Sequence, residues 1–131
     1  MENEPRLKIA VVEDEEALQR VLCEWLESEG YQAIGITTGP EAVRRIPQEK
    51  PALILLDIIL PELNGFEVMK ILKDNPATAN IPIVVLSNLG DGEQQARASA
   101  LGAASYLIKA EHDFASMKKI INGTLRKDQT G

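Results

Sequence analysis

The sequence predicts a doubly wound α/β fold, in which a five-stranded parallel sheet carries helices on both faces. The chain has 131 residues, the size of one ordinary domain. Short apolar runs alternate with longer amphipathic segments along nearly the whole chain. The apolar runs contain few polar residues, which is typical of strands buried on both faces. Strands that alternate with helices pair in parallel, because each helix carries the chain back across the sheet.

The first unit is expected as a strand at Leu7–Val12 and a helix at Glu15–Glu29. The acidic start of this helix suits the positive end of the helix dipole, and Gly30 ends it. Cys23 lies off the apolar stripe, so we expect it to have only a structural role. The stripe itself is predicted from apolar residues at helical spacing: Leu18, Val21, Leu22, Trp25 and Leu26.

The later units show similar signals at their helix starts. Pro40 is expected at the first position of the second helix, where its missing N–H is not needed. Asn64-Gly65 forms a turn before the third helix, and Asp91-Gly92 leads into an alanine-rich fourth helix. Asp113 can cap the last helix. The expected strands are Gln32–Thr37, Leu53–Leu56, Ile83–Leu86 and Ser105–Ile108, and the expected helices are Gly39–Glu49, Phe66–Lys73, about Gly92–Leu101, and one with the inner face Phe114, Met117, Ile120, Ile121 and Leu125.

Five such units favour the flavodoxin-like strand order 2-1-3-4-5. In sheets of this kind, functional residues lie beyond the carboxyl ends of the strands, where the strand order reverses between strands one and three. The domain core is expected at about residues 7–126. The ends, about Met1–Arg6 and Lys127–Gly131, are expected to fray.

Five polar residues follow the apolar strands at that end of the sheet. Glu13 and Asp14 follow the first strand, Asp57 the third, Ser87 the fourth and Lys109 the fifth. Three converging carboxylates would repel one another unless a cation joined them, and Mg²⁺ prefers such oxygen ligands. A carboxylate at the centre of such a cluster can attack phosphorus, while a hydroxyl and an ammonium can hold phosphoryl oxygens. Each residue alone has a plainer explanation, such as a helix start or a solvated lysine, but the combination predicts phosphoryl transfer.

The sequence resembles the receiver domain of two-component response regulators over about Leu7 to Leu125. Four segments carry the resemblance, and their order and spacing are more specific than any one of them. They are VVEDEE at Val11–Glu16, LILLDIILPELNGFE at Leu53–Glu67, VVLSN at Val84–Asn88 and GAASYLIK at Gly102–Lys109.

The resemblance implies a role for each site residue. Asp57 would be the phosphoryl acceptor and a metal ligand. Glu13 and Asp14 would hold Mg²⁺, Glu13 through water, and Ile59 would offer its backbone carbonyl to the metal. Ser87 and Lys109 would contact the phosphoryl group. The remaining implied roles are those of Tyr106, which would be the aromatic switch that moves inward when Ser87 is drawn to the phosphate, and of Pro61 and Gly65, which would shape the loop after the acceptor strand.

Three features depart from the commonest family pattern. Ala110 follows Lys109 where the family usually has a cis proline. A cis bond before a non-proline residue costs about 2.5–4 kcal/mol, so we expect a trans bond and a reshaped loop. Asn88 could narrow access to Asp57, bond the phosphate or simply face solvent. Ile59 and Leu89 are apolar and cannot orient a water, so we expect slow hydrolysis of the aspartyl phosphate.

The expected function is a switch in which Asp57 accepts a phosphoryl group from a phosphohistidine on a sensor histidine kinase or phosphotransfer protein. The alanine-rich fourth helix is the expected mobile element, because few large residues anchor it. One alternative is a constitutive, unphosphorylated interaction module. A flavodoxin-like cofactor binder is disfavoured, because four acidic residues at Glu13–Glu16 would repel an anionic cofactor.

Composition and charge indicate which partners and which cell compartment to expect. The net charge is −6, and the short basic pairs Lys118-Lys119 and Arg126-Lys127 are no nucleic-acid footprint, so we expect no direct nucleic-acid binding. No apolar run reaches the roughly 20 residues of a membrane span. A single cysteine and an acidic, polar start fit the cytoplasm.

Few residues follow the last helix, so we expect either a downstream protein target or an output domain missing from this chain. We expect His112 to be exposed.

Overall fold

The apolar segments form five strands in the structure, a computed structural model that describes residues 6–130. All neighbouring strands pair in parallel, in the order β2-β1-β3-β4-β5. This confirms the predicted doubly wound, flavodoxin-like order, with the reversal between β1 and β3. The strands are β1 (Lys8–Val12), β2 (Gln32–Ile36), β3 (Leu53–Leu56), β4 (Ile83–Ser87) and β5 (Ser105–Ile108).

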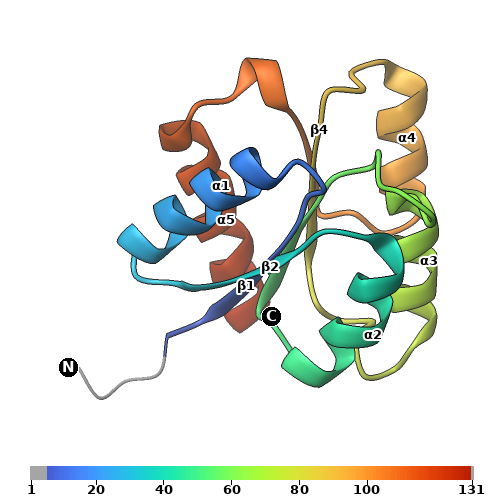
Figure 1. Ribbon diagram of the computed structural model, residues 1–131, viewed down its shortest axis with the longest axis horizontal. Coiled ribbons are helices and arrows are strands. Elements are labelled where there is room, and N and C mark those ends of the chain that lie inside the picture. The colour runs from blue at the N-terminus through green and yellow to red at the C-terminus, as the bar shows by residue number, and fades with distance from the viewer. Residues whose placement is uncertain (1–5, 131) are drawn as a thin grey trace.

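Five helices cover both faces of this sheet, α1 and α5 on one face and α2, α3 and α4 on the other (Figure 1). They are α1 (Glu16–Ser28), α2 (Gly39–Glu49), α3 (Gly65–Asp74), α4 (Gly92–Ala100) and α5 (Phe114–Thr130). Each large apolar side chain buried under them contributes about 1.5–3 kcal/mol. The buried side chains of α2, α3 and α4 are Ala42, Ile46, Phe66, Val68, Met69, Leu72 and Ala98, and those of α1 and α5 are Leu22, Leu26, Met117, Ile121 and Leu125.

Side-chain caps begin four of these helices. Because the first backbone N–H groups of a helix have no partner within it, a side-chain oxygen just before the helix can accept from one of them. Pro40 occupies the second helical position, one later than predicted, because Thr38 caps a helix that begins at Gly39. The caps are Thr38, Asn64, Asp91 and the predicted Asp113, which accept from the N–H groups of Glu41, Glu67, Gln94 and Ser116 at 3.2, 3.0, 2.9 and 2.9 Å.

The predicted apolar stripes of α1 and α5 need two corrections. The buried face of α1 is centred on Leu22 and Leu26, so Val21 lies about 120° away at 100° per residue and is 47% exposed. Cys23 lies nearer that centre and packs against the core. Phe114 was expected on the inner face of α5 but is 43% exposed. It stacks on the half-buried Trp25, with ring centroids 4.8 Å apart.

The chain after β5 forms a short 3₁₀ turn, Lys109–Glu111. No cis peptide bond occurs among the described residues, so the predicted trans Lys109–Ala110 bond is confirmed. The last helix continues to Thr130, past Lys127, where fraying was expected; neither glycine nor proline interrupts residues 124–130. Of the other residues expected to fray, Arg6 donates to Glu27 Oε1 at 2.7 Å. Residues 1–5 and 131 lie outside the described residues. Within the described residues, no helix is long and apolar enough to cross a membrane.

Candidate functional site

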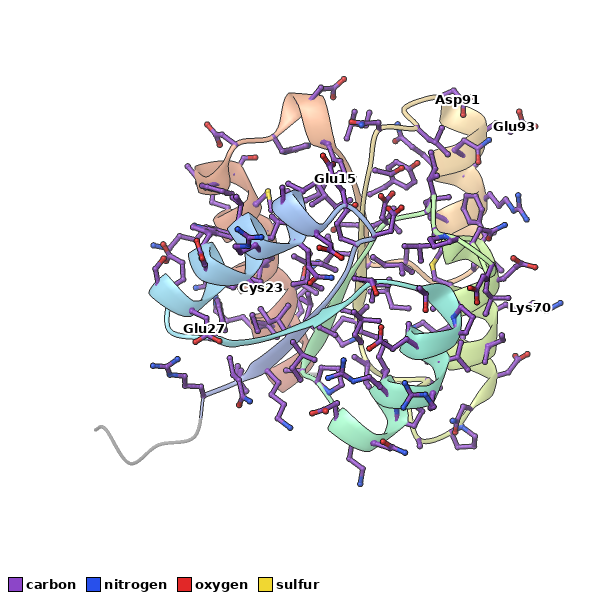
Figure 2. All side chains as sticks on the ribbon, in the orientation of Figure 1. Glu15, Cys23, Glu27, Lys70, Asp91 and Glu93 are labelled. Carbon is purple, nitrogen blue, oxygen red and sulfur yellow. The ribbon has the colours of Figure 1, made fainter. Side chains whose placement is uncertain are left out.

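The structure brings the predicted polar residues together at the carboxyl end of the sheet. Figure 2 labels Glu15 and Asp91, near the starts of α1 and α4, at this same end of the molecule. Glu13 and Asp14 follow β1, and Asp57 follows β3. One carboxylate oxygen from each of these three lies within 4.8 Å of the other two. Such proximity is expected, because β1 and β3 are neighbours whose ends lie side by side.

Asp57 is held rigidly from both sides of its carboxylate. The residue is only 6% exposed. Its Oδ1 accepts a hydrogen bond from the Ile59 N–H at 3.2 Å, and its Oδ2 accepts one from Lys109 Nζ at 3.0 Å. The Asp57 N–H donates to the Val12 carbonyl at 3.0 Å, which extends the pairing of β3 with β1. A reacting group must therefore approach Asp57 from the solvent side of the cluster.

Lys109 partly neutralises the carboxylates from the β5 side. Its Nζ donates to Glu13 Oε1 at 2.8 Å as well as to Asp57 Oδ2, and its side chain is 17% exposed. Burial lowers the pKa of Lys109, but the bonds to Glu13 and Asp57 outweigh burial and raise this pKa above its usual value. Burial raises the pKa of Glu13, against the opposing hydrogen bonds from Lys109 and from the Glu15 N–H.

Ser87, Leu89 and Tyr106 form a connected group beside Asp57. Ser87 is fully buried, and its Oγ accepts from the Leu89 N–H at 3.2 Å. The Tyr106 hydroxyl donates to the Leu89 carbonyl at 2.5 Å, and the ring packs against the core under α2–α4. Burial raises the pKa of Tyr106. Ser87 and the predicted switch residue therefore share one hydrogen-bonded loop.

Two glycines let helices approach the loop after Asp57. A Cβ on Gly65 would lie 2.4 Å from the Asp57 carbonyl oxygen, so the predicted role of Gly65 has a steric cause. A Cβ on Gly39 would lie 2.0 Å from the Leu63 carbonyl oxygen. Gly39 was predicted only as a helix start, because its second role depends on a contact with a distant loop. In the loop between Asp57 and Gly65, Glu62 has a left-handed φ of 70°.

The residues that depart from the commonest family pattern mostly face solvent. Asn88 and Ala110 are exposed, which supports the solvent-facing interpretation of Asn88. Ile59 is 57% exposed and Leu89 is half-buried. His112 is half-buried rather than exposed, because its Nδ1 lies 2.7 Å from Ser116 Oγ.

Residues 9–122 match the family model of the response regulator receiver domain. The chain belongs to this family. PhoB, the phosphate regulon transcriptional regulatory protein of Rhizobium meliloti (strain 1021), is 41% identical over 102 residues, which are 78% of this chain and 45% of PhoB. The receiver domain thus spans less than half the length of this curated relative.

Two solved receiver domains share this fold. The receiver domain of sensor histidine kinase PA1611 from Pseudomonas aeruginosa PAO1, with magnesium coordinated in its active site cleft, has a TM-score of 0.84 and 25% identity, covering 92% of this chain and 98% of that one. The BeF3-activated N-terminal receiver domain of Klebsiella pneumoniae RstA has a TM-score of 0.82 and 27% identity, covering 91% and 98%.

The donor set of this receiver domain fits Mg²⁺. Glu13, Asp14 and Asp57 offer only hard oxygen ligands, gathered within 4.8 Å. Asp14 is exposed, which leaves open positions for the waters that Mg²⁺ tends to keep. A divalent cation would also relieve the repulsion that Lys109 alone offsets incompletely, with one ammonium against three carboxylates.

Proposed function

We propose that this chain is a phosphorylation-activated signalling switch in which Asp57 accepts a phosphoryl group. The observation that carries the proposal is the buried Asp57 carboxylate, set between Lys109 and the acidic residues that follow β1. The donor is a phosphohistidine on a sensor histidine kinase or phosphotransfer protein. The product is an aspartyl phosphate, and its charge changes the surface that a downstream protein or an output domain recognises.

The phosphoryl transfer is a single displacement at phosphorus, for which the protein supplies the nucleophile and holds it in position. A carboxylate oxygen of Asp57 attacks phosphorus, while the bond from phosphorus to the donor nitrogen breaks and its electron pair stays on that nitrogen. The Ile59 N–H and Lys109 Nζ hold the carboxylate in place for this attack. Mg²⁺ held by Glu13, Asp14, Asp57 and the Ile59 carbonyl would neutralise charge on the transferring group. Lys109 lies close enough to pair with the new phosphoryl oxygens.

The hydrogen-bonded group of Ser87, Leu89 and Tyr106 would act as the switch. In the phosphorylated state the Ser87 hydroxyl turns to a phosphoryl oxygen, which removes the acceptor of the Leu89 N–H. The Tyr106 hydroxyl already bonds the Leu89 carbonyl, so the loop and the ring respond together. The neighbouring α4 is the element that this change biases.

A mass measurement tests the proposal. The protein is incubated with a small phosphodonor and Mg²⁺, and its intact mass is followed over time. We expect a gain of one phosphoryl group that is lost in Asp57→Asn and kept in the matched control Asp74→Asn, an exposed aspartate at the end of α3. An unmodified wild-type chain, or a modified Asp57→Asn, would contradict it, and the former would favour the constitutive interaction module.

The same time course also reports the lifetime of the phosphate. We propose slow hydrolysis, because Ile59 and Leu89, which follow Asp57 and Ser87 by two residues, carry apolar side chains that cannot orient an attacking water. We further propose that residues 1–131 form one cytoplasmic receiver domain with no direct contact to nucleic acid or membrane. The net charge of −6 supports the absence of nucleic-acid and membrane contacts, because it would repel phosphate backbones and anionic lipid surfaces.

A further inference from the structure

Gln19 joins three elements next to the metal-binding residues. It lies in the second turn of α1, and its Nε2 donates to the Glu13 carbonyl at 3.0 Å and to the Ile36 carbonyl at 2.9 Å. The Glu13 N–H donates to that same Ile36 carbonyl at 2.9 Å. One side-chain amide therefore ties α1, the loop after β1 and the end of β2 together.

Gly35 on β2 makes room for this amide. A Cβ at Gly35 would lie 2.4 Å from Gln19 Oε1 and 2.7 Å from its Cδ, well inside van der Waals contact. The φ of Gly35 does not lie in the left-handed region, so backbone conformation does not call for glycine here. The requirement comes from the Gln19 amide, which occupies the space of a side chain.

The carbonyl that Gln19 holds belongs to the peptide between Glu13 and Asp14. A peptide group is planar, so fixing this carbonyl fixes the plane from which Asp14 departs. Asp14 is exposed, whereas Glu13 is also held by Lys109 Nζ and by the Glu15 N–H. Asp14 thus depends on the backbone for its position more than the other carboxylates of the cluster do.

We propose that Gln19 is a positioning residue for the Mg²⁺ site, acting through the Glu13–Asp14 peptide, and that Gly35 is its required partner. The proposal rests on the Mg²⁺ site of the proposed function. Groups that orient metal ligands without touching the metal typically change metal affinity 10–100-fold when removed.

Two variants remove this contact in different ways. Gln19→Met keeps the length of the side chain but deletes its donors. Gly35→Ala leaves Gln19 intact and displaces its amide, which is the far end of a flexible side chain and can move without unfolding the sheet. The matched controls are Arg20→Met, an exposed neighbour on α1, and Gly123→Ala, whose new Cβ would meet nothing within 4 Å.

Titration calorimetry with MgCl₂ on the folded proteins gives the dissociation constants. We expect roughly tenfold weaker Mg²⁺ binding in Gln19→Met and in Gly35→Ala, and wild-type binding in both controls. In the double variant Gly35→Ala should add almost nothing to Gln19→Met, because both remove one contact. Hydrogen exchange without metal should show faster exchange of the Glu13 N–H in both variants.

The outcomes separate two failures. If the wild type binds no Mg²⁺, the proposed function fails and this inference fails with it. If the wild type binds Mg²⁺ and both variants bind within twofold of it, only the role of Gln19 is wrong. Two variants that do not fold, as judged by circular dichroism, would show Gln19 to be a structural residue and would also overturn the proposal.

Discussion

At the scale of single residues, the site depends on one largely buried cation. Lys109 donates to Glu13 at 2.8 Å and to Asp57 at 3.0 Å, with 17% of its side chain exposed. Removing one partner of a buried ion pair leaves the other charges without compensation, and this costs more than the pair itself contributes. Lys109 therefore stabilises the fold as well as serving the proposed chemistry.

We expect Lys109→Met to lower the free energy of unfolding by about 3 kcal/mol when no divalent cation is present. Urea denaturation in EDTA measures this. The matched control is Lys118→Met, which removes an exposed bridge to Glu29 with 53% of the lysine side chain accessible. That loss should stay under about 1 kcal/mol. Equal losses in the two variants would contradict the structural role of Lys109.

The principal site residues were predictable because each lies at or just beyond the end of an apolar strand. Asp57, Ser87 and Lys109 needed only the strand ends and the parallel order to be placed together. Gln19 and Gly35 could not be found this way. Gln19 stands among the polar positions of an amphipathic helix, and its partners Glu13 and Ile36 lie on other elements, so its role exists only in the folded structure.

At the scale of elements, a charged network joins α2 to the end of β2. Glu41 Oε2 accepts from Arg45 Nη1 at 2.9 Å, and its Oε1 accepts from the Thr37 N–H at 3.2 Å. Arg45 also donates to the Gly35 carbonyl at 3.3 Å. Burial would raise the pKa of Glu41, but the hydrogen bond from Arg45, followed by those from Thr37, lowers this pKa below its ordinary value of 4.5.

A lowered pKa in the folded state means that the ionised Glu41 stabilises the fold. This contribution is present above about pH 4.5, the ordinary value, and is lost as the pH falls through the lower folded pKa. We expect Glu41→Gln to cost about 1 kcal/mol at pH 7, with the difference from wild type shrinking toward pH 3. Urea denaturation across this range measures it, with the exposed Glu24→Gln as control. A deficit that is unchanged at pH 3 would show that charge is not its cause.

At the scale of the molecule, the sheet and its coverage were predictable, whereas the details of helix faces were not. Periodicity is local in the sequence, so strands, helices and their order follow from it. Which residue at the edge of a stripe is buried depends on the exact rotation of the helix. Val21 and Phe114 were assigned inward on spacing alone and proved 47% and 43% exposed.

The helices α3 and α4 cover the same face of the sheet, but they are anchored by very different numbers of buried residues. On α4 the buried residue is Ala98, whereas α3 buries five: Gly65, Phe66, Val68, Met69 and Leu72. Besides the Asp91 cap, Arg97 links α4 to α3, with its guanidinium 4.2 Å from the centre of the Phe66 ring. An exposed cation–π contact contributes only about 0.5–1 kcal/mol, so α4 has little to oppose a local opening.

We therefore expect native-state hydrogen exchange to show α4 opening separately from the rest of the sheet. Its amides should exchange at least about tenfold faster than those of α3. Arg97→Ala should speed exchange in α4 while leaving the strands unchanged, and the exposed Lys70→Ala on α3 should do neither (Figure 2). If α4 and α3 exchanged together, α4 could not move independently of the core. A change at Ser87 and Tyr106 would then need another element to reach the surface.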